Sequence, residues 1–121
     1  MHGGWLAAMA VVALGTALPA GGAAAQDTVR VCVRNEAAFV AIASFSEVVR
    51  STGLIPRSQH SFPVLQQACE TYPRTAEVHV RVAANRLIDH HQLCAFSRIA
   101  ALGDLTITVH GSLFNAWCTE R

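Results

Sequence analysis

The stretch TVRVCVR at residues 28–34 sets the fold class, because apolar and polar side chains alternate along it. Its three valines fall on one face of an extended chain, and its two arginines and Cys32 fall on the other. The stretches AEVHVRV at residues 76–82 and LTITV at residues 105–109 follow the same pattern. Alternation of this kind in segments rich in β-branched residues is typical of strands with one buried face. The sequence therefore predicts three half-buried strands at these positions.

Residues that break regular structure recur about every ten positions along the mature part of the chain. They are Asn35-Glu36, residues 53–56, Pro63, Pro73, Asn85, Gly103-Asp104 and Gly111-Ser112. This spacing suits short strands joined by turns and is too close for most helices. We therefore expect an all-β fold, a small and mostly antiparallel β-sandwich of six to seven short strands that fills residues 26–121 as one domain.

Three segments are harder to assign. Residues 39–49 (FVAIASFSEVV) fit a strand buried on both faces or a helix with an apolar stripe, and the all-β context favours the strand. Residues 86–102 follow neither period, and we expect a strand there with a short helix as the alternative. Residues 61–68 are expected to form a short edge strand, because Pro63 is excluded from a central one.

Residues 1–25 have the features of a signal peptide. They contain no Lys, Arg, Asp or Glu, and residues 6–18 (LAAMAVVALGTAL) form an apolar core of the expected length. Three alanines at residues 23–25 supply the small side chains that a signal peptidase recognises. We expect cleavage after Ala25 and a periplasmic or secreted protein. An uncleaved anchor over residues 5–25 is the alternative, although Ala and Gly dominate this segment and contribute little transfer energy.

Four cysteines lie in the mature part of the chain, and an even number in a short exported protein predicts a disulfide framework. They are Cys32, Cys69, Cys94 and Cys118. Three pairings are possible, and we expect Cys32–Cys69 and Cys94–Cys118 because cysteines adjacent in sequence often lie on adjacent strands. The short Cys-x-x-Cys spacing of zinc and thiol-redox sites is missing from the sequence.

The composition excludes several classes of function. A formal net charge of +1 leaves no basic surplus to hold a phosphate backbone, so nucleic acid is not an expected partner. The nine cationic residues are all Arg, which rules out lysine Schiff-base chemistry and, with the Ala-rich composition, points to a GC-rich bacterial source. There is no Gly-x-Ser-x-Gly motif, and the eight acidic residues are scattered. We therefore expect neither enzymatic activity nor a cofactor.

Histidines are the residues that suggest metal chemistry. His79 and His110 fall on the polar faces of two predicted strands, and their rings would approach if those strands pair. His90 or His91 could then add a third ligand, since imidazole is the commonest ligand of zinc and copper. A periplasmic copper- or zinc-binding protein is therefore the alternative function, while the simpler interpretation is a set of solvated surface histidines.

Two aromatic residues near the C-terminus suggest a binding surface. Phe114 and Trp117 lie in the segment LFNAWC, and together with Arg98 they would form the kind of patch that anchors a partner. Packing against the disulfide of Cys118 is the competing explanation. We expect a non-catalytic binding or interaction module for a protein or cell-envelope partner, with a mature domain that does not span a membrane.

Overall fold

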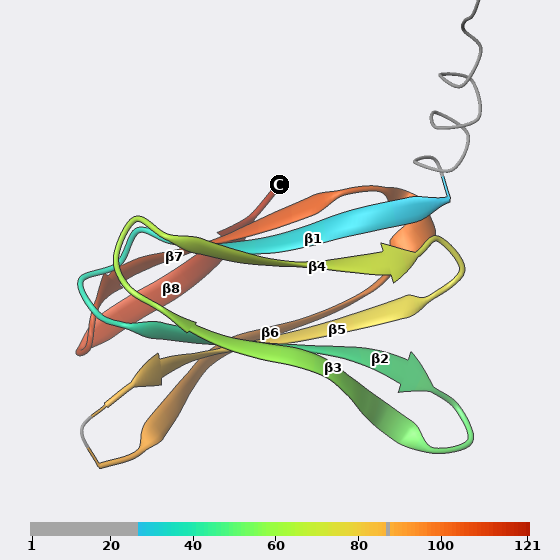
Figure 1. Ribbon diagram of the computed structural model, residues 1–121. Coiled ribbons are helices and arrows are strands. Elements are labelled where there is room, and N and C mark those ends of the chain that lie inside the picture. Colours follow the sequence, from blue (N-terminus) through green and yellow to red (C-terminus); the bar gives the residue numbers. More distant parts are fainter. Residues whose placement is uncertain (1–26, 87) are drawn as a thin grey trace, which may run out of the picture.

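The computed structural model describes residues 27–86 and 88–121, and the predicted signal peptide lies outside these residues. These described residues form eight strands and one short 3₁₀ helix, η2 (Figure 1). Their bounds are β1 Thr28–Asn35, β2 Ala41–Val49, β3 Gly53–Phe62, β4 Gln67–Pro73, β5 Glu77–Asn85, β6 His90–Ile99, η2 Ala100–Leu102, β7 Leu105–Ser112 and β8 Asn115–Glu120. The all-β prediction is confirmed, with eight strands instead of six to seven.

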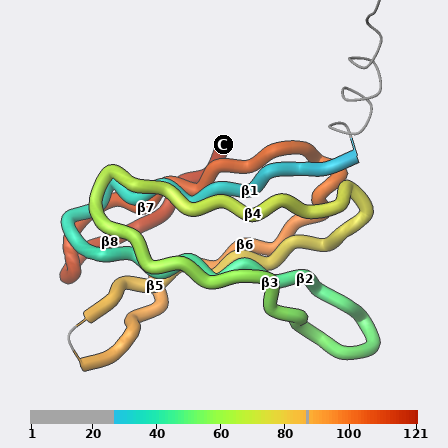
Figure 2. Tube along the Cα trace, viewed as in Figure 1, coloured from blue at the N-terminus to red at the C-terminus, as the bar shows by residue number. Residues whose placement is uncertain are grey.

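The strands form two four-stranded sheets that lie face to face (Figures 1 and 2). The first sheet has the order β4-β1-β7-β8, and the second has the order β3-β2-β5-β6. Neighbouring strands are antiparallel except for β1 and β7, which run parallel. The architecture is therefore the mostly antiparallel β-sandwich that the turn spacing predicts.

The core lies between the sheets and is built mainly from the alternating valines. Val29, Val31 and Val33 of β1 are buried against the valines of β5, of which Val78 is one. Tyr72 and Phe45 are the largest fully buried side chains. Each buried Val or Phe contributes about 1.5–3 kcal/mol relative to an exposed one, so this alternation supplies much of the driving force for folding.

The segments that were hard to assign are mostly strands. Residues 39–49 contain β2, in which Ala41, Ala43 and Phe45 face the core, and residues 86–102 contain β6 followed by the single turn of η2. A strand tolerates the mixed apolar pattern of β2 because its outer face is also partly covered.

The prediction of an edge strand at residues 61–68 is wrong. Residues 61–62 end β3, residues 63–66 form a turn, and residues 67–68 begin β4, so the segment joins two edge strands and forms none of its own. Gly53 and Pro56 obscured β3 because they resemble turn residues. Pro56 is tolerated there because an edge strand has one side without a ladder partner.

Both predicted disulfides are confirmed. Cys32–Cys69 links directly opposed residues of β1 and β4 within one sheet, whereas Cys94–Cys118 links β6 of one sheet to β8 of the other. Every cysteine is therefore oxidised, as in proteins of oxidising, extracytoplasmic compartments.

Candidate functional site

Four connections gather at one end of the sandwich, at the left of Figure 1, and we call this region the loop end. They are residues 36–40, 63–66, 86–89 (of which 87 is not described) and 113–114. Backbone hydrogen bonds tie the first connection to its neighbours, from Ala38 N to Gly111 O and from Leu65 N to Asn35 O. The loop end is thus a continuous surface made from both sheets.

Asn35 holds this end together from inside. Its side chain is fully buried, and its amide nitrogen donates to Phe39 O at 2.7 Å and to Phe62 O at 3.3 Å. Its amide oxygen accepts from Ala37 N at 2.9 Å. A buried amide with satisfied hydrogen bonds fixes its neighbours, because breaking those bonds would leave polar groups unpaired away from water. Asn35 therefore fixes the β1–β2 connection against the end of β3.

Large apolar side chains project from the loop end into solvent. Phe114 is 99% exposed at the tip of the β7–β8 hairpin, whose last paired residues are Ser112 and Asn115. Ile88 on the β5–β6 connection is 92% exposed, and Leu65 on the β3–β4 turn is 65% exposed. Three connections at the same end of the sandwich thus each expose a large apolar side chain.

Leu65 has a backbone conformation that favours glycine. Its φ is +68°, and the turn that contains it is closed by a hydrogen bond from Gln66 N to Pro63 O. A leucine in this region costs about 1–3 kcal/mol of strain, which persists only where the surrounding structure enforces it. Here the hydrogen bond from Leu65 N to Asn35 O, at 2.7 Å, holds the residue in place.

Gly111 permits the tight β7–β8 hairpin that carries Phe114. Its φ is +99°, and a Cβ at this position would lie 2.9 Å from Ala116 Cα and closer still to Asn115 O. A side chain would therefore displace the opposing strand.

Trp117 lies beside the loop end on the outer face of its sheet. Its ring is 51% exposed and stacks on His110, with ring centroids 5.5 Å apart and planes inclined at 19°. His110 Nε2 is 2.9 Å from Thr119 Oγ1, and its Nδ1 is 4.0 Å from Glu36 Oε1. These contacts fix the orientation of the exposed tryptophan.

Arg98 does not join this surface. It lies on β6 near the opposite end of the sandwich, where its Nη2 donates to Leu102 O at 3.3 Å. The predicted patch of Phe114, Trp117 and Arg98 is therefore incomplete, because β6 runs away from the loop end before it reaches residue 98.

The predicted histidine arrangement is not formed either. His79 is on β5 and His110 is on β7, and these strands belong to different sheets, so they do not pair. His79 instead contacts Ser97 at 2.8 Å, while His90 and His91 are exposed at the start of β6. Among residues 27–86 and 88–121, no group of three His, Cys, Asp or Glu side chains is placed to hold a metal ion.

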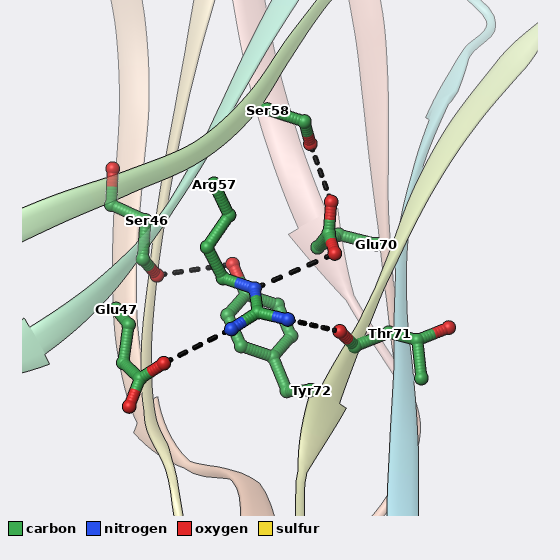
Figure 3. Close-up of polar contacts among 7 residues, drawn as sticks. All are labelled: Ser46, Glu47, Arg57, Ser58, Glu70, Thr71 and Tyr72. Carbon is green, nitrogen blue, oxygen red and sulfur yellow. Dashed lines mark hydrogen bonds and ion pairs between the residues drawn. The ribbon is translucent and has the colours of Figure 1, made fainter.

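An arginine clasp closes one edge of the sandwich (Figure 3). Arg57 of β3 lies 3.1 Å from Glu47 of β2 and 3.4 Å from Glu70 of β4, and its Nη2 donates to Thr71 O at 3.0 Å. Its guanidinium carbon also lies 4.9 Å from the centre of the Tyr72 ring. The clasp therefore joins the outermost strands of the two sheets. The sequence gives no sign of it, since a break in strand register decides where Arg57 points.

Tyr72 forms the floor of this clasp. Its hydroxyl donates to Ser46 O at 3.0 Å, which adds another link between the sheets. Burial raises the pKa of Tyr72 well above its usual value, and the nearby carboxylate of Glu70 raises it further. The hydroxyl is thus held neutral.

Comparison with known proteins defines the fold more closely. The sequence matches no protein-family model and no curated protein. The structure is similar to the membrane-binding domain of pneumolysin, with a TM-score of 0.56 and 7% identity over 78% of this chain and 96% of that domain. It is also similar to part of listeriolysin O (TM-score 0.58, 9% identity) and of suilysin from Streptococcus suis (0.55, 11%).

These similarities concern the fold alone. Each alignment covers 78% of this chain but only 22% of listeriolysin O and 23% of suilysin. The chain therefore corresponds to a small part of those proteins. Within residues 27–86 and 88–121, none of the helical structure is long and apolar enough to cross a membrane.

Proposed function

We propose that this protein is an exported, non-catalytic binding module, periplasmic or secreted, that attaches to the lipid surface of a cell envelope through its loop end. The observation that carries the proposal is the almost complete exposure of Phe114 at the tip of a hairpin that Gly111 makes tight. Covering an exposed aromatic side chain with a partner or an interface is favourable in free energy.

The other connections add to the same surface. Leu65 and Ile88 are exposed on two other connections of the loop end, so each can add to the contact that Phe114 makes. Each is worth about 1.5–3 kcal/mol when fully covered. Trp117 lies just behind them, at the level where tryptophan is enriched in membrane interfaces. The arrangement suits shallow attachment to a lipid surface.

The charges of the loop end are locally balanced. Arg86 is paired with Asp89 at 2.7 Å, and Arg34 is paired with Glu36 at 2.9 Å. Because no excess of positive charge faces the interface at these pairs, we expect attachment to depend on apolar burial more than on anionic lipid.

One structural neighbour is the membrane-binding domain of pneumolysin, and this similarity supports a lipid surface as the partner in preference to a protein. This support is an analogy of fold at 7% identity, and the exposure of Phe114 does not depend on it.

Flotation with phosphatidylcholine vesicles tests the proposal. The unmodified protein should float with the vesicles, and Phe114→Ser should weaken binding roughly 10-fold or more, as expected for losing one buried aromatic side chain. Leu102→Ser is the matched control, because Leu102 is 69% exposed at the opposite end of the sandwich. It should change binding less than about 2-fold.

Two results would overturn the proposal. One is that the protein stays unbound with phosphatidylcholine vesicles and with vesicles that contain phosphatidylglycerol. The other is that Leu102→Ser weakens binding as much as Phe114→Ser does, which would place the contact away from the loop end.

A further inference from the structure

A break in strand register distorts the outer face of the second sheet, away from the loop end. Phe45 of β2 pairs with Ser58 of β3, but Ser46 pairs with Pro56, so Arg57 is an extra residue in β3. An extra residue of this kind is a β-bulge, which bends its strand and opens the surface beside it. The guanidinium of Arg57 is engaged by the two carboxylates of the clasp.

An open pocket of about 330 Å³ lies at this bulge. Ser44 and Ser46 form its floor, because their neighbour Phe45 points into the core and strand residues alternate between faces. Gln59 and Arg81 stand on either side of Ser44, directly opposite it on β3 and β5. The small serine side chains between two long ones leave the space that the pocket occupies.

Arg81 has no partner of its own in this pocket. Throughout the described residues, its guanidinium forms no hydrogen bond or ion pair, although the other pocket arginine, Arg57, has two carboxylate partners. A guanidinium offers a fork of N–H donors that matches the two oxygens of a carboxylate or phosphate group. The charge of Arg81 is therefore available to an anionic ligand.

The other side chains of the pocket suit a ligand that has hydroxyl groups on a carbon ring. The Ser44 hydroxyl donates to Gln59 Oε1 at 3.2 Å, which leaves the amide nitrogen of Gln59 to donate outward. Ser46 adds a second hydroxyl, and exposed Pro56 supplies an apolar surface against which C–H groups of a ring can pack.

We infer that this pocket, centred on Arg81, binds a sugar that carries an anionic group, with Arg81 on the carboxylate or phosphate and with Ser44 and Gln59 on the hydroxyl groups. Acidic sugars and phosphorylated sugars share this chemistry. The site is separate from the loop end, and it does not depend on attachment to lipid.

Amide chemical shifts recorded during titration of the protein test the inference. The probes are glucuronate and glucose 6-phosphate, with glucose as their shared sugar half and with acetate and inorganic phosphate as their respective anionic halves. We expect glucuronate, glucose 6-phosphate or both to saturate with a millimolar dissociation constant, roughly ten times tighter than either half. The shifts should centre on Ser44, Gln59 and Arg81, and the better probe identifies which anion is preferred.

Two variants separate the site from general charge effects. Arg81→Gln should weaken binding at least 10-fold, because the neutral amide loses the ionic hydrogen bonds. Arg50→Gln removes an equal charge from the exposed β2–β3 turn and should leave the dissociation constant within about 2-fold. The inference is overturned if neither charged sugar saturates, if the shifts centre elsewhere, or if Arg81→Gln binds as the unmodified protein does.

Discussion

The guanidinium of Arg57 lies 3.4 Å from the carboxylate of Glu70, so β3 of one sheet is tied to β4 of the other. At the opposite edge, the Cys94–Cys118 disulfide ties β6 to β8. Each pair consists of the outermost strands of the two sheets. The sandwich is thus closed at one edge by ionic and hydrogen-bonded contacts and at the other edge by a covalent bond.

Replacing Arg57 should destabilise the fold. In Arg57→Ala, the carboxylates of Glu47 and Glu70 lose their common counter-charge and Thr71 O loses its donor. Because the clasp is partly exposed, we expect a loss of about 1–2 kcal/mol in the free energy of unfolding by urea. Arg50→Ala is the control and should stay within about 0.5 kcal/mol. Equal effects of the two variants would show that the clasp contributes nothing.

Removing the disulfide between the sheets should lower the free energy of unfolding by more than removing Arg57 does. The Cys94–Cys118 bond closes a loop of 24 residues. The chain-entropy relation then gives about 3–4 kcal/mol for the double variant Cys94→Ala/Cys118→Ala, measured by urea unfolding without reductant. A loss below about 1 kcal/mol would mean that the clasp and the core already hold the two sheets together.

The stability of the protein should fall in alkaline solution because of Tyr72. Its pKa in the folded protein lies above the ordinary value of 10.0, so its stabilising effect is complete below pH 10 and is lost as the pH rises beyond it, where the unfolded chain releases the proton. The slope is at most about 1.4 kcal/mol per pH unit, the limit for one proton.

The sequence makes this pH test unusually clean, because it contains one tyrosine, no lysine and no free cysteine. Unfolding by urea between pH 8 and pH 11 should show the decline in the unmodified protein and lose it in Tyr72→Phe. Tyr72→Phe should also lower stability by about 1 kcal/mol at neutral pH, because the hydrogen bond to Ser46 O is lost. The same alkaline decline in both proteins would assign it to another group.

Relieving the strain at Leu65 should stabilise the protein while weakening its attachment. Glycine adopts the φ of +68° freely, so Leu65→Gly should raise the free energy of unfolding by about 0.5–1 kcal/mol after allowance for the greater freedom of glycine in the unfolded chain. Vesicle binding should fall, because an exposed apolar side chain is removed. A variant that is both less stable and fully able to bind would contradict the role given to Leu65.

Alternation of apolar residues was sufficient to predict the fold class. The valines of residues 28–34 and 76–82 set which faces of β1 and β5 are buried, and the order of the cysteines predicted their pairing. The strand β3 was missed because Phe62 is its one buried residue, so no alternation of apolar residues marks it, and because Pro56 resembles a turn residue.

The candidate sites were predictable only in part. Phe114 and Trp117 stand out as aromatic residues beside a glycine turn, and the structure places both near the loop end. The strand partners of Arg98 and His79 depend on which strands share a sheet, and periodicity within a strand contains no such information. The clasp and the Arg81 pocket both depend on the bulge at Arg57, which is a property of pairing between strands.

The fluorescence of Trp117 tests the proposed attachment most directly. In a protein that begins at Gln26, Trp117 is the single tryptophan, and it lies half exposed beside the loop end. We predict that phosphatidylcholine vesicles shift its emission to shorter wavelength and that lipids brominated on the acyl chains quench it. Emission that stays unchanged, with no quenching at a large excess of lipid, would contradict attachment through the loop end.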